Sequence, residues 1–166
     1  MAALATGTKA PEFELKGLDG KPFYLGDELG RGAVVLVFFK VSCPTCQYAL
    51  PFFERLHKSY GRNGFTLVGV SQNDAKETAA FNNKELGVTF PVLLDDPRSY
   101  AASNSYGLTN VPTIFWIAPD GDIEISSVGW VRQEMEEFNQ RAAQALSEAT
   151  KPLFLPEEHI ADFRAG

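Results

Sequence analysis

The stretch Val35–Pro51, VLVFFKVSCPTCQYALP, decides how the rest of the sequence is interpreted. The apolar run Ala33–Phe39 is rich in β-branched and aromatic residues and too short for a typical helix, so it predicts a buried parallel strand. Cys43 and Cys46 come next, and the apolar residues after them recur at helical spacing. A strand that delivers a C-x-x-C pair to the start of a helix has the geometry of a redox-active dithiol.

The start of the predicted helix should treat the two thiols differently. Unpaired backbone N–H groups and the positive end of the helix dipole favour a thiolate at Cys43. Cys46 lies one turn further into the helix, so it is expected to be more shielded but within disulfide reach of Cys43. Pro44 suits the first helical turn, where its missing N–H has no intrahelical partner.

The length and composition predict one soluble domain over residues 1–149, followed by an extension over residues 150–166 that packs on the domain or against a partner. The chain has 166 residues, of which 45% are apolar and 22% charged, and its net charge of −6 argues against nucleic-acid or acidic-lipid binding. No apolar run approaches the roughly 20 residues that span a bilayer. The opening residues lack the pattern of a secretory signal, so a cytoplasmic location is expected, with a periplasmic protein whose leader was removed as the alternative.

The cysteine count separates a catalytic pair from a structural framework. The chain has two cysteines and both lie in the C-x-x-C motif, so a scaffold of structural disulfides is impossible. In a cytosolic chain such a pair is more often catalytic or metal-binding than structural.

The remaining periodicity predicts a central mixed sheet with helices on both faces. Besides the central strand, strands are expected at Glu12–Lys16, Pro22–Leu25, Phe65–Ser71, Phe90–Leu94, Thr113–Ala118 and Ile123–Val128. Helices are expected at Asp27–Gly30, from the dithiol to a stop at Gly61–Gly64, at Asp74–Leu86, at Ser99–Tyr106 and at Val131–Ala149. The inward face of the last helix should consist of Met135, Phe138, Ala142, Ala145 and Leu146.

Several motifs in the expected order resemble the thioredoxin superfamily, in the branch that holds the AhpC/TSA (redoxin) proteins and the TlpA-like thiol–disulfide oxidoreductases. These are the opening Thr8–Leu15, the Cys43–Cys46 motif, Pro51 in the helix, Val111-Pro112-Thr113, and the turn Pro119-Asp120-Gly121. The resemblance covers residues 8 to about 148. It implies a thioredoxin-like fold with an N-terminal β-hairpin, a β-α insertion between the central strands and a cis bond before Pro112.

Three positions depart from the family pattern. Ser42 stands where thioredoxins usually carry Trp, Val37 replaces the buried acid, and Ala49 replaces a Glu that is frequent in the TlpA-like enzymes. The group that deprotonates Cys46 is therefore not identified.

The resemblance implies thiol–disulfide exchange. Cys43 would attack a substrate disulfide and Cys46 would resolve the mixed disulfide. Pro44, Thr45, Val111, Pro112 and Trp130 are candidates for shaping the substrate site. No cofactor is expected. The expected partners are a protein or small-molecule disulfide and a thiol electron donor that the sequence does not identify; the oligomeric state is left open.

The main alternative is a peroxiredoxin-like peroxidase, with Cys43 attacking a hydroperoxide and Cys46 resolving the sulfenic acid. Such a site needs a hydroxyl where this chain has Lys40, and an arginine for which Arg98 and Arg132 are candidates. Lys40 is expected to face solvent rather than to pair with the thiolate of Cys43.

Two further alternatives carry less support. A metal site needs about four ligands, and beyond the two thiols the chain offers only His57 and His159, which are expected at the surface. A non-catalytic interaction module would use the aromatic residues as a binding surface, but their spacing places most of them in the core.

Overall fold

Strand β3 (Ala33–Phe39) lies inside a seven-stranded sheet with the order β2-β1-β5-β4-β3-β6-β7. The computed structural model describes residues 3–60 and 64–166. β3, β4 and β5 are parallel, and β6, β7, β1 and β2 join them as antiparallel neighbours. The bounds of the other strands of this sheet are β1 Glu14–Gly17, β2 Pro22–Tyr24, β4 Phe65–Ser71, β5 Val92–Leu94, β6 Thr113–Ile117 and β7 Ile123–Val128. The expected mixed sheet with an N-terminal hairpin is confirmed.

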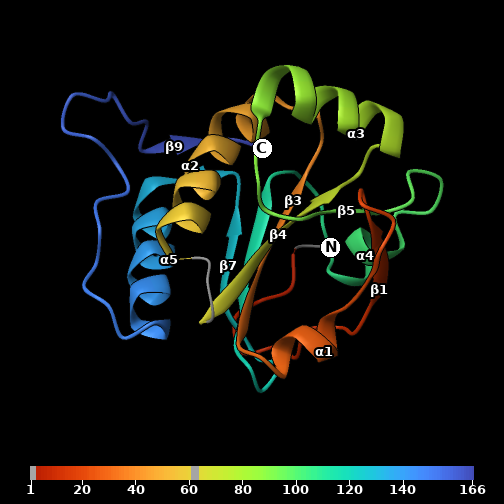
Figure 1. Ribbon diagram of the computed structural model, residues 1–166, viewed down its shortest axis with the longest axis horizontal. Coiled ribbons are helices and arrows are strands. Elements are labelled where there is room, and N and C mark those ends of the chain that lie inside the picture. Colours follow the sequence, from red (N-terminus) through yellow and green to blue (C-terminus); the bar gives the residue numbers. More distant parts are fainter. Residues whose placement is uncertain (1–2, 61–63) are drawn as a thin grey trace.

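Helices cover both faces of the sheet (Figure 1). Side chains of α2 (Pro44–Tyr60), α3 (Ala75–Phe81) and α5 (Arg132–Ala145) pack into one core with alternate residues of β3. The other residues of β3 pack with α1 (Leu25–Leu29) and α4 (Ala101–Ser105) in a second core. All seven residues of β3 are buried because both faces of the strand are covered, which explains its unbroken apolar run.

Several helices are shorter than their patterns indicate. The expected helix Asp74–Leu86 divides into α3 and the π-helical turn η1 (Asn82–Leu86), while Asp74 caps it as expected by accepting from the N–H of Glu77. The expected Val131–Ala149 ends early because Ser147 has a φ of 53°. Ala145, the last residue of α5, is exposed, which corrects its assignment to the inward face. The expected stop at Gly61–Gly64 lies mostly outside the described residues.

Residues 150–166 pack against their own domain. They run along the outer side of α5 and return across α2, drawn in dark blue in Figure 1. There β9 (Phe163–Arg164) pairs antiparallel with β8 (Trp130–Val131), the strand that directly precedes α5. Within the part of the chain that the structure describes, no helix is long and apolar enough to cross a membrane.

Candidate active site

Cys43 lies in the short loop between β3 and α2, at the point where the helix begins. The N–H of Gln47 donates to the carbonyl of Cys43 at 2.9 Å, which closes the first helical turn. The backbone N–H of Cys46 donates to Cys43 Sγ at 3.1 Å. A helix N-terminus that directs an N–H at a sulfur stabilises negative charge on that sulfur. Both cysteines are free thiols, and Cys43 is half-buried.

The loop before β6 brings a second backbone group to Cys43. The thiol of Cys43 donates to the carbonyl of Val111 at 3.4 Å. The Val111–Pro112 peptide bond is cis, as the resemblance implied, and Pro112 is buried. Thr113 Oγ1 donates to the carbonyl of Asn110 at 2.7 Å, so the loop is tied to the start of β6. The motif and the Val111–Pro112 loop therefore meet at one sulfur although they are far apart in sequence.

Cys46 lies in the core beneath Cys43. Its side chain is fully buried, and this burial, together with the contact to the Cys43 side chain, raises the pKa of the Cys46 thiol far above its usual range. Val37 and Ala49, which replace the acids of related proteins, are also buried. The core around Cys46 is thus lined by apolar side chains at both positions where an acid could have accepted its proton.

Two side chains that the sequence interpretation missed hold the loop before Cys43. Asn73 Oδ1 accepts from the N–H of Val41 at 3.0 Å, and Gln47 Nε2 donates to the carbonyl of Val41 at 2.8 Å. Asn73 follows β4, and the carboxyl ends of parallel strands meet at one edge of a sheet. That rule could have placed Asn73 beside the loop that follows β3.

The remaining predicted site residues, Pro44, Thr45 and Trp130, differ in their exposure and contacts. Pro44 is exposed at the first helical residue, and Thr45 is buried, donating from Oγ1 to the carbonyl of Ala165 at 2.6 Å. Trp130 is only 1% exposed and its Nε1 donates to the carbonyl of Ala161 at 2.6 Å. Trp130 therefore shapes this region by holding the C-terminal segment, and its indole is not open to a substrate.

The basic candidates are engaged elsewhere. Lys40 is half-buried, and its ammonium group lies 5.5 Å from the ring centroid of Tyr100. Arg98 pairs with Asp96 at 2.9 Å, and Arg132 lies over the ring of Phe154. Neither arginine takes the place beside Cys43 that a peroxidase would require.

The histidines lie apart from the thiols. His57 is half-buried rather than at the surface: its ring packs edge-on to Phe90, and its Nδ1 is buried with no hydrogen-bond partner among the described residues. His159 is exposed. No group of three or more His, Cys, Asp or Glu residues that could hold a metal ion occurs among residues 3–60 and 64–166.

A cavity of about 230 Å³ opens beside the Val111–Pro112 loop. Its lining includes Lys40, Gln72, Tyr100, Asn104, Asn110 and Val111. The cavity is thus next to the carbonyl that contacts Cys43, and polar groups line much of it.

Comparisons with known proteins agree with this geometry. The AhpC/TSA family matches residues 6–126. The thiol–disulfide oxidoreductase ResA of Geobacillus thermodenitrificans is 30% identical over 132 residues, covering 80% of this chain and 74% of the relative. ResA of Bacillus subtilis is 30% identical over 133 residues, covering 80% of this chain and 73% of the relative.

A solved structure is similar to this chain in both fold and sequence. The crystal structure of a thiol:disulfide interchange protein of the thioredoxin family from Chlorobium tepidum superposes with a TM-score of 0.69 at 30% identity. The superposition covers 87% of this chain and 99% of that protein.

Proposed function

The chain belongs to the AhpC/TSA family and is a thiol–disulfide oxidoreductase of thioredoxin-like fold, and we propose that within this activity Cys43 is the attacking thiolate and Cys46 the resolving thiol. The observation that carries this assignment is the unequal environment of the two sulfurs. Cys43 is half-buried and its Sγ accepts the Cys46 N–H at 3.1 Å, whereas the Cys46 side chain is fully buried. Only Cys43 is open to a substrate.

The reaction consists of two exchanges at sulfur. The Cys43 thiolate attacks one sulfur of a substrate disulfide, so a mixed disulfide forms and the other substrate sulfur leaves as a thiolate that takes up a proton. Cys46 then loses its proton and attacks Cys43 Sγ, which releases the second substrate thiolate. Two electrons pass to the substrate, and the Cys43–Cys46 disulfide remains. A thiol donor returns the pair to its reduced form.

The experiment that tests the assignment compares two activities of the purified protein. Reduction of insulin disulfides driven by dithiothreitol is measured beside consumption of hydrogen peroxide, for the wild type and for Cys43→Ser and Cys46→Ser. We expect insulin reduction in the wild type only, with negligible peroxide turnover, because each sulfur is needed for one of the two exchanges. Cys46→Ser should still form a mixed disulfide with a substrate, while Cys43→Ser should not.

Two results would contradict the proposal. Rapid peroxide consumption that depends on Cys43 would make the protein a peroxidase with an unusual site. A mixed disulfide formed by Cys43→Ser and absent from Cys46→Ser would exchange the roles of the two cysteines.

We further propose that the substrates are protein disulfides, that a cellular dithiol is the electron donor, and that the protein works as a reductase in the cytoplasm. The support for the location is that both cysteines belong to the dithiol, so the fold needs no structural disulfide and suits a reducing compartment. Alkylation of whole cells followed by mass spectrometry tests this. A mostly reduced pair, in a cytoplasmic fraction, is expected; a mostly oxidised pair in a periplasmic fraction would overturn it.

A further inference from the structure

Residues 161–166, named here the covering segment, lie against both halves of the dithiol site. The carbonyl of Ala165 accepts from the hydroxyl of Thr45, the residue between the two cysteines, at 2.6 Å. The carbonyl of Gly166 accepts from Asn110 Nδ2 at 3.5 Å. Gly166 also approaches the carbonyl of Val111 so closely that an added Cβ would lie 2.5 Å from that oxygen. The same carbonyl accepts the thiol of Cys43, so the covering segment reaches the immediate neighbour of the reacting sulfur.

Backbone hydrogen bonds and ring contacts hold the covering segment in place. The N–H of Ala161 donates to the hydroxyl of Tyr48 at 3.1 Å, and the Arg164 guanidinium lies 4.5 Å from the centroid of the same ring. Arg164 pairs with Trp130 in the two-residue ladder of β8 and β9. Such a short ladder is marginal without further packing. Phe163 is 63% exposed and adds little burial.

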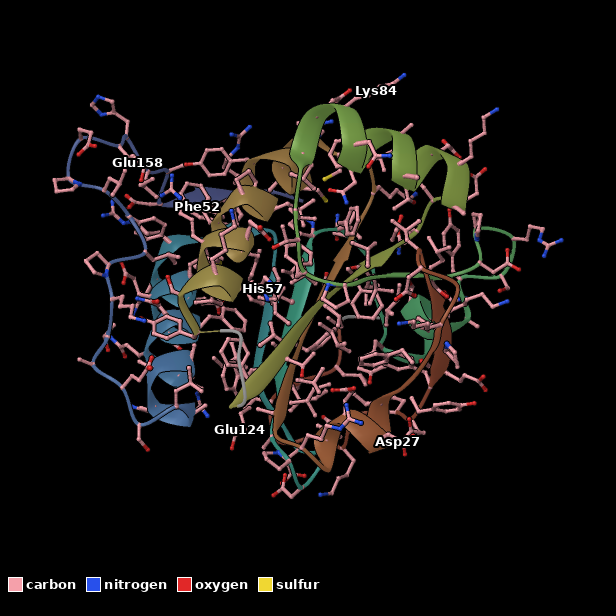
Figure 2. The ribbon with its side chains drawn as sticks, viewed as in Figure 1. Asp27, Phe52, His57, Lys84, Glu124 and Glu158 are labelled. Atoms are coloured by element: carbon pink, nitrogen blue, oxygen red, sulfur yellow. The ribbon has the colours of Figure 1, made fainter. Side chains whose placement is uncertain are left out.

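The residues just before the covering segment are also anchored by the packing of apolar side chains. Leu153 is buried, and Phe154 packs edge-on against Phe52 of α2. Glu158 accepts two hydrogen bonds from the guanidinium of Arg55, at 2.7 and 2.6 Å. Figure 2 shows Glu158 on the outlying chain beside the helix that carries Phe52. Hydrogen bonds hold the covering segment, including the bond from Trp130 Nε1 to the carbonyl of Ala161, but none of its six residues is buried. The covering segment can therefore leave the site while the preceding residues stay in place.

We propose that the covering segment occupies the surface on which a protein substrate binds, and that such a substrate must displace it to reach Cys43; this inference rests on the proposed thiol–disulfide exchange. A disulfide within a polypeptide brings its flanking backbone against Thr45, Asn110 and Val111, which are the groups that the covering segment now contacts. A small disulfide needs only the exposed part of the Cys43 sulfur. The covering segment therefore slows protein substrates selectively.

The substitution Gly166→Val separates these two classes of substrate. Its Cβ would collide with the backbone carbonyl of Val111, which cannot turn aside as a flexible side chain would, so the tip must lift. Gly166 is exposed, and the change does not enter the core. His159→Val is the matched control, because it adds the same side chain at an exposed position of the segment before the covering residues.

Two substrates are reduced by each variant with dithiothreitol as the donor, namely insulin and hydroxyethyl disulfide. A protein substrate binds only the fraction of molecules whose covering segment has left the site, and its apparent affinity is reduced by that fraction. We therefore expect kcat/KM for insulin to rise by about threefold or more in Gly166→Val. The value for hydroxyethyl disulfide should stay the same, and His159→Val should match the wild type for both. Hydrogen exchange at residues 161–165 should become faster in Gly166→Val alone.

An insulin kcat/KM that is unchanged or lower in Gly166→Val, with faster exchange at residues 161–165, would overturn the inference. If Gly166→Val melts well below the wild type, Tyr48→Phe replaces it and the same outcomes decide, because it removes the hydroxyl that holds Ala161 and keeps the ring. Wild-type protein that reduces neither substrate would instead contradict the proposed function, so the two failures are distinguishable.

Discussion

Cys43 and Cys46 are three residues apart, yet their surroundings are opposite. Cys43 lies half-buried in a loop, where its sulfur contacts the N–H of Cys46 and the carbonyl of Val111 from a distant part of the chain. Cys46 lies inside α2 with no exposed surface, in a core of apolar side chains. One turn of helix is enough to give one thiol access and the other protection. The order of the two exchanges thus follows from burial, and the four predictions below test that contrast.

The largest effect is expected in the alkylation of the two thiols. In the folded, reduced protein at neutral pH, iodoacetamide should label Cys43 about 100-fold faster than Cys46, because only an accessible thiolate reacts. Mass spectrometry after brief labelling measures the ratio. In guanidinium chloride the two rates should become similar, and similar rates in the folded protein would remove the basis of the contrast.

The next effect concerns the pH dependence of resolution. Burial raises the pKa of the Cys46 thiol, so the thiolate that attacks Cys43 is scarce at neutral pH and becomes more abundant as the pH rises. Far below that pKa, the rate of the second exchange should rise about tenfold per pH unit.

The measurement uses a thionitrobenzoate adduct on Cys43, whose release by Cys46 is followed by stopped flow between pH 6 and about 9, a range that includes the usual pKa of a free cysteine. In Cys46→Ser the release should be lost. A flat pH profile would mean that another group of the protein accepts the proton of Cys46 directly.

A smaller effect is expected at the loop that holds Cys43. Asn73→Ala leaves the N–H of Val41 without its acceptor, which should lower the free energy of unfolding by about 1 kcal/mol. Insulin reduction should fall severalfold, since Cys43 is less well placed. Denaturant unfolding and the insulin assay measure the two effects. Lys76→Ala, at an exposed neighbouring position of α3, is the control and should behave like the wild type; equal losses in both variants would argue against the hydrogen bond as the cause.

The smallest effect is expected at the anchor before the covering segment. The guanidinium of Arg55 and the N–H of Leu155 lower the pKa of Glu158 from 4.5 to about 2. An acid whose pKa is lower in the folded protein stabilises it above 4.5, and this contribution is lost as the pH falls from 4.5 toward 2. Glu158→Gln should therefore lower Tm slightly at neutral pH.

Thermal melts of Glu158→Gln and the wild type should converge near the lower limit of that pH range. Glu157→Gln is the control, because this neighbour is exposed, and its melting temperature should equal that of the wild type throughout. A difference between Glu158→Gln and the wild type that persists unchanged in acid would exclude the ion pair as its source.

The central strands could be predicted to the residue, and the last helix could not. β3 and β4 have the expected bounds because both are buried, mostly apolar runs between polar or glycine-rich stretches. The helix α5 ends before its sequence pattern does, because Ser147 adopts a positive φ that no apolar period reports. Backbone turns of this kind depend on the chain that follows.

The candidate site was likewise predicted from the sequence only in part. The Cys43–Cys46 pair and the cis bond before Pro112 were expected from a motif and a resemblance, and the structure brings them together. The contact between Thr45 and Ala165 was not expected, because the two residues are 120 positions apart. The strand β9 that precedes Ala165, and with it the ladder to β8, is only two residues long. A ladder that short leaves no periodic pattern in the sequence.

The match to the AhpC/TSA family ends at residue 126, well before the covering segment. The residues that perform the chemistry and the residues that lie over it are thus separate pieces of one chain. On our proposal, substitutions in these six residues would alter how readily protein disulfides reach the site, relative to small disulfides, and leave the dithiol untouched. Selectivity in this protein could then diverge, or be redesigned, independently of the redox chemistry.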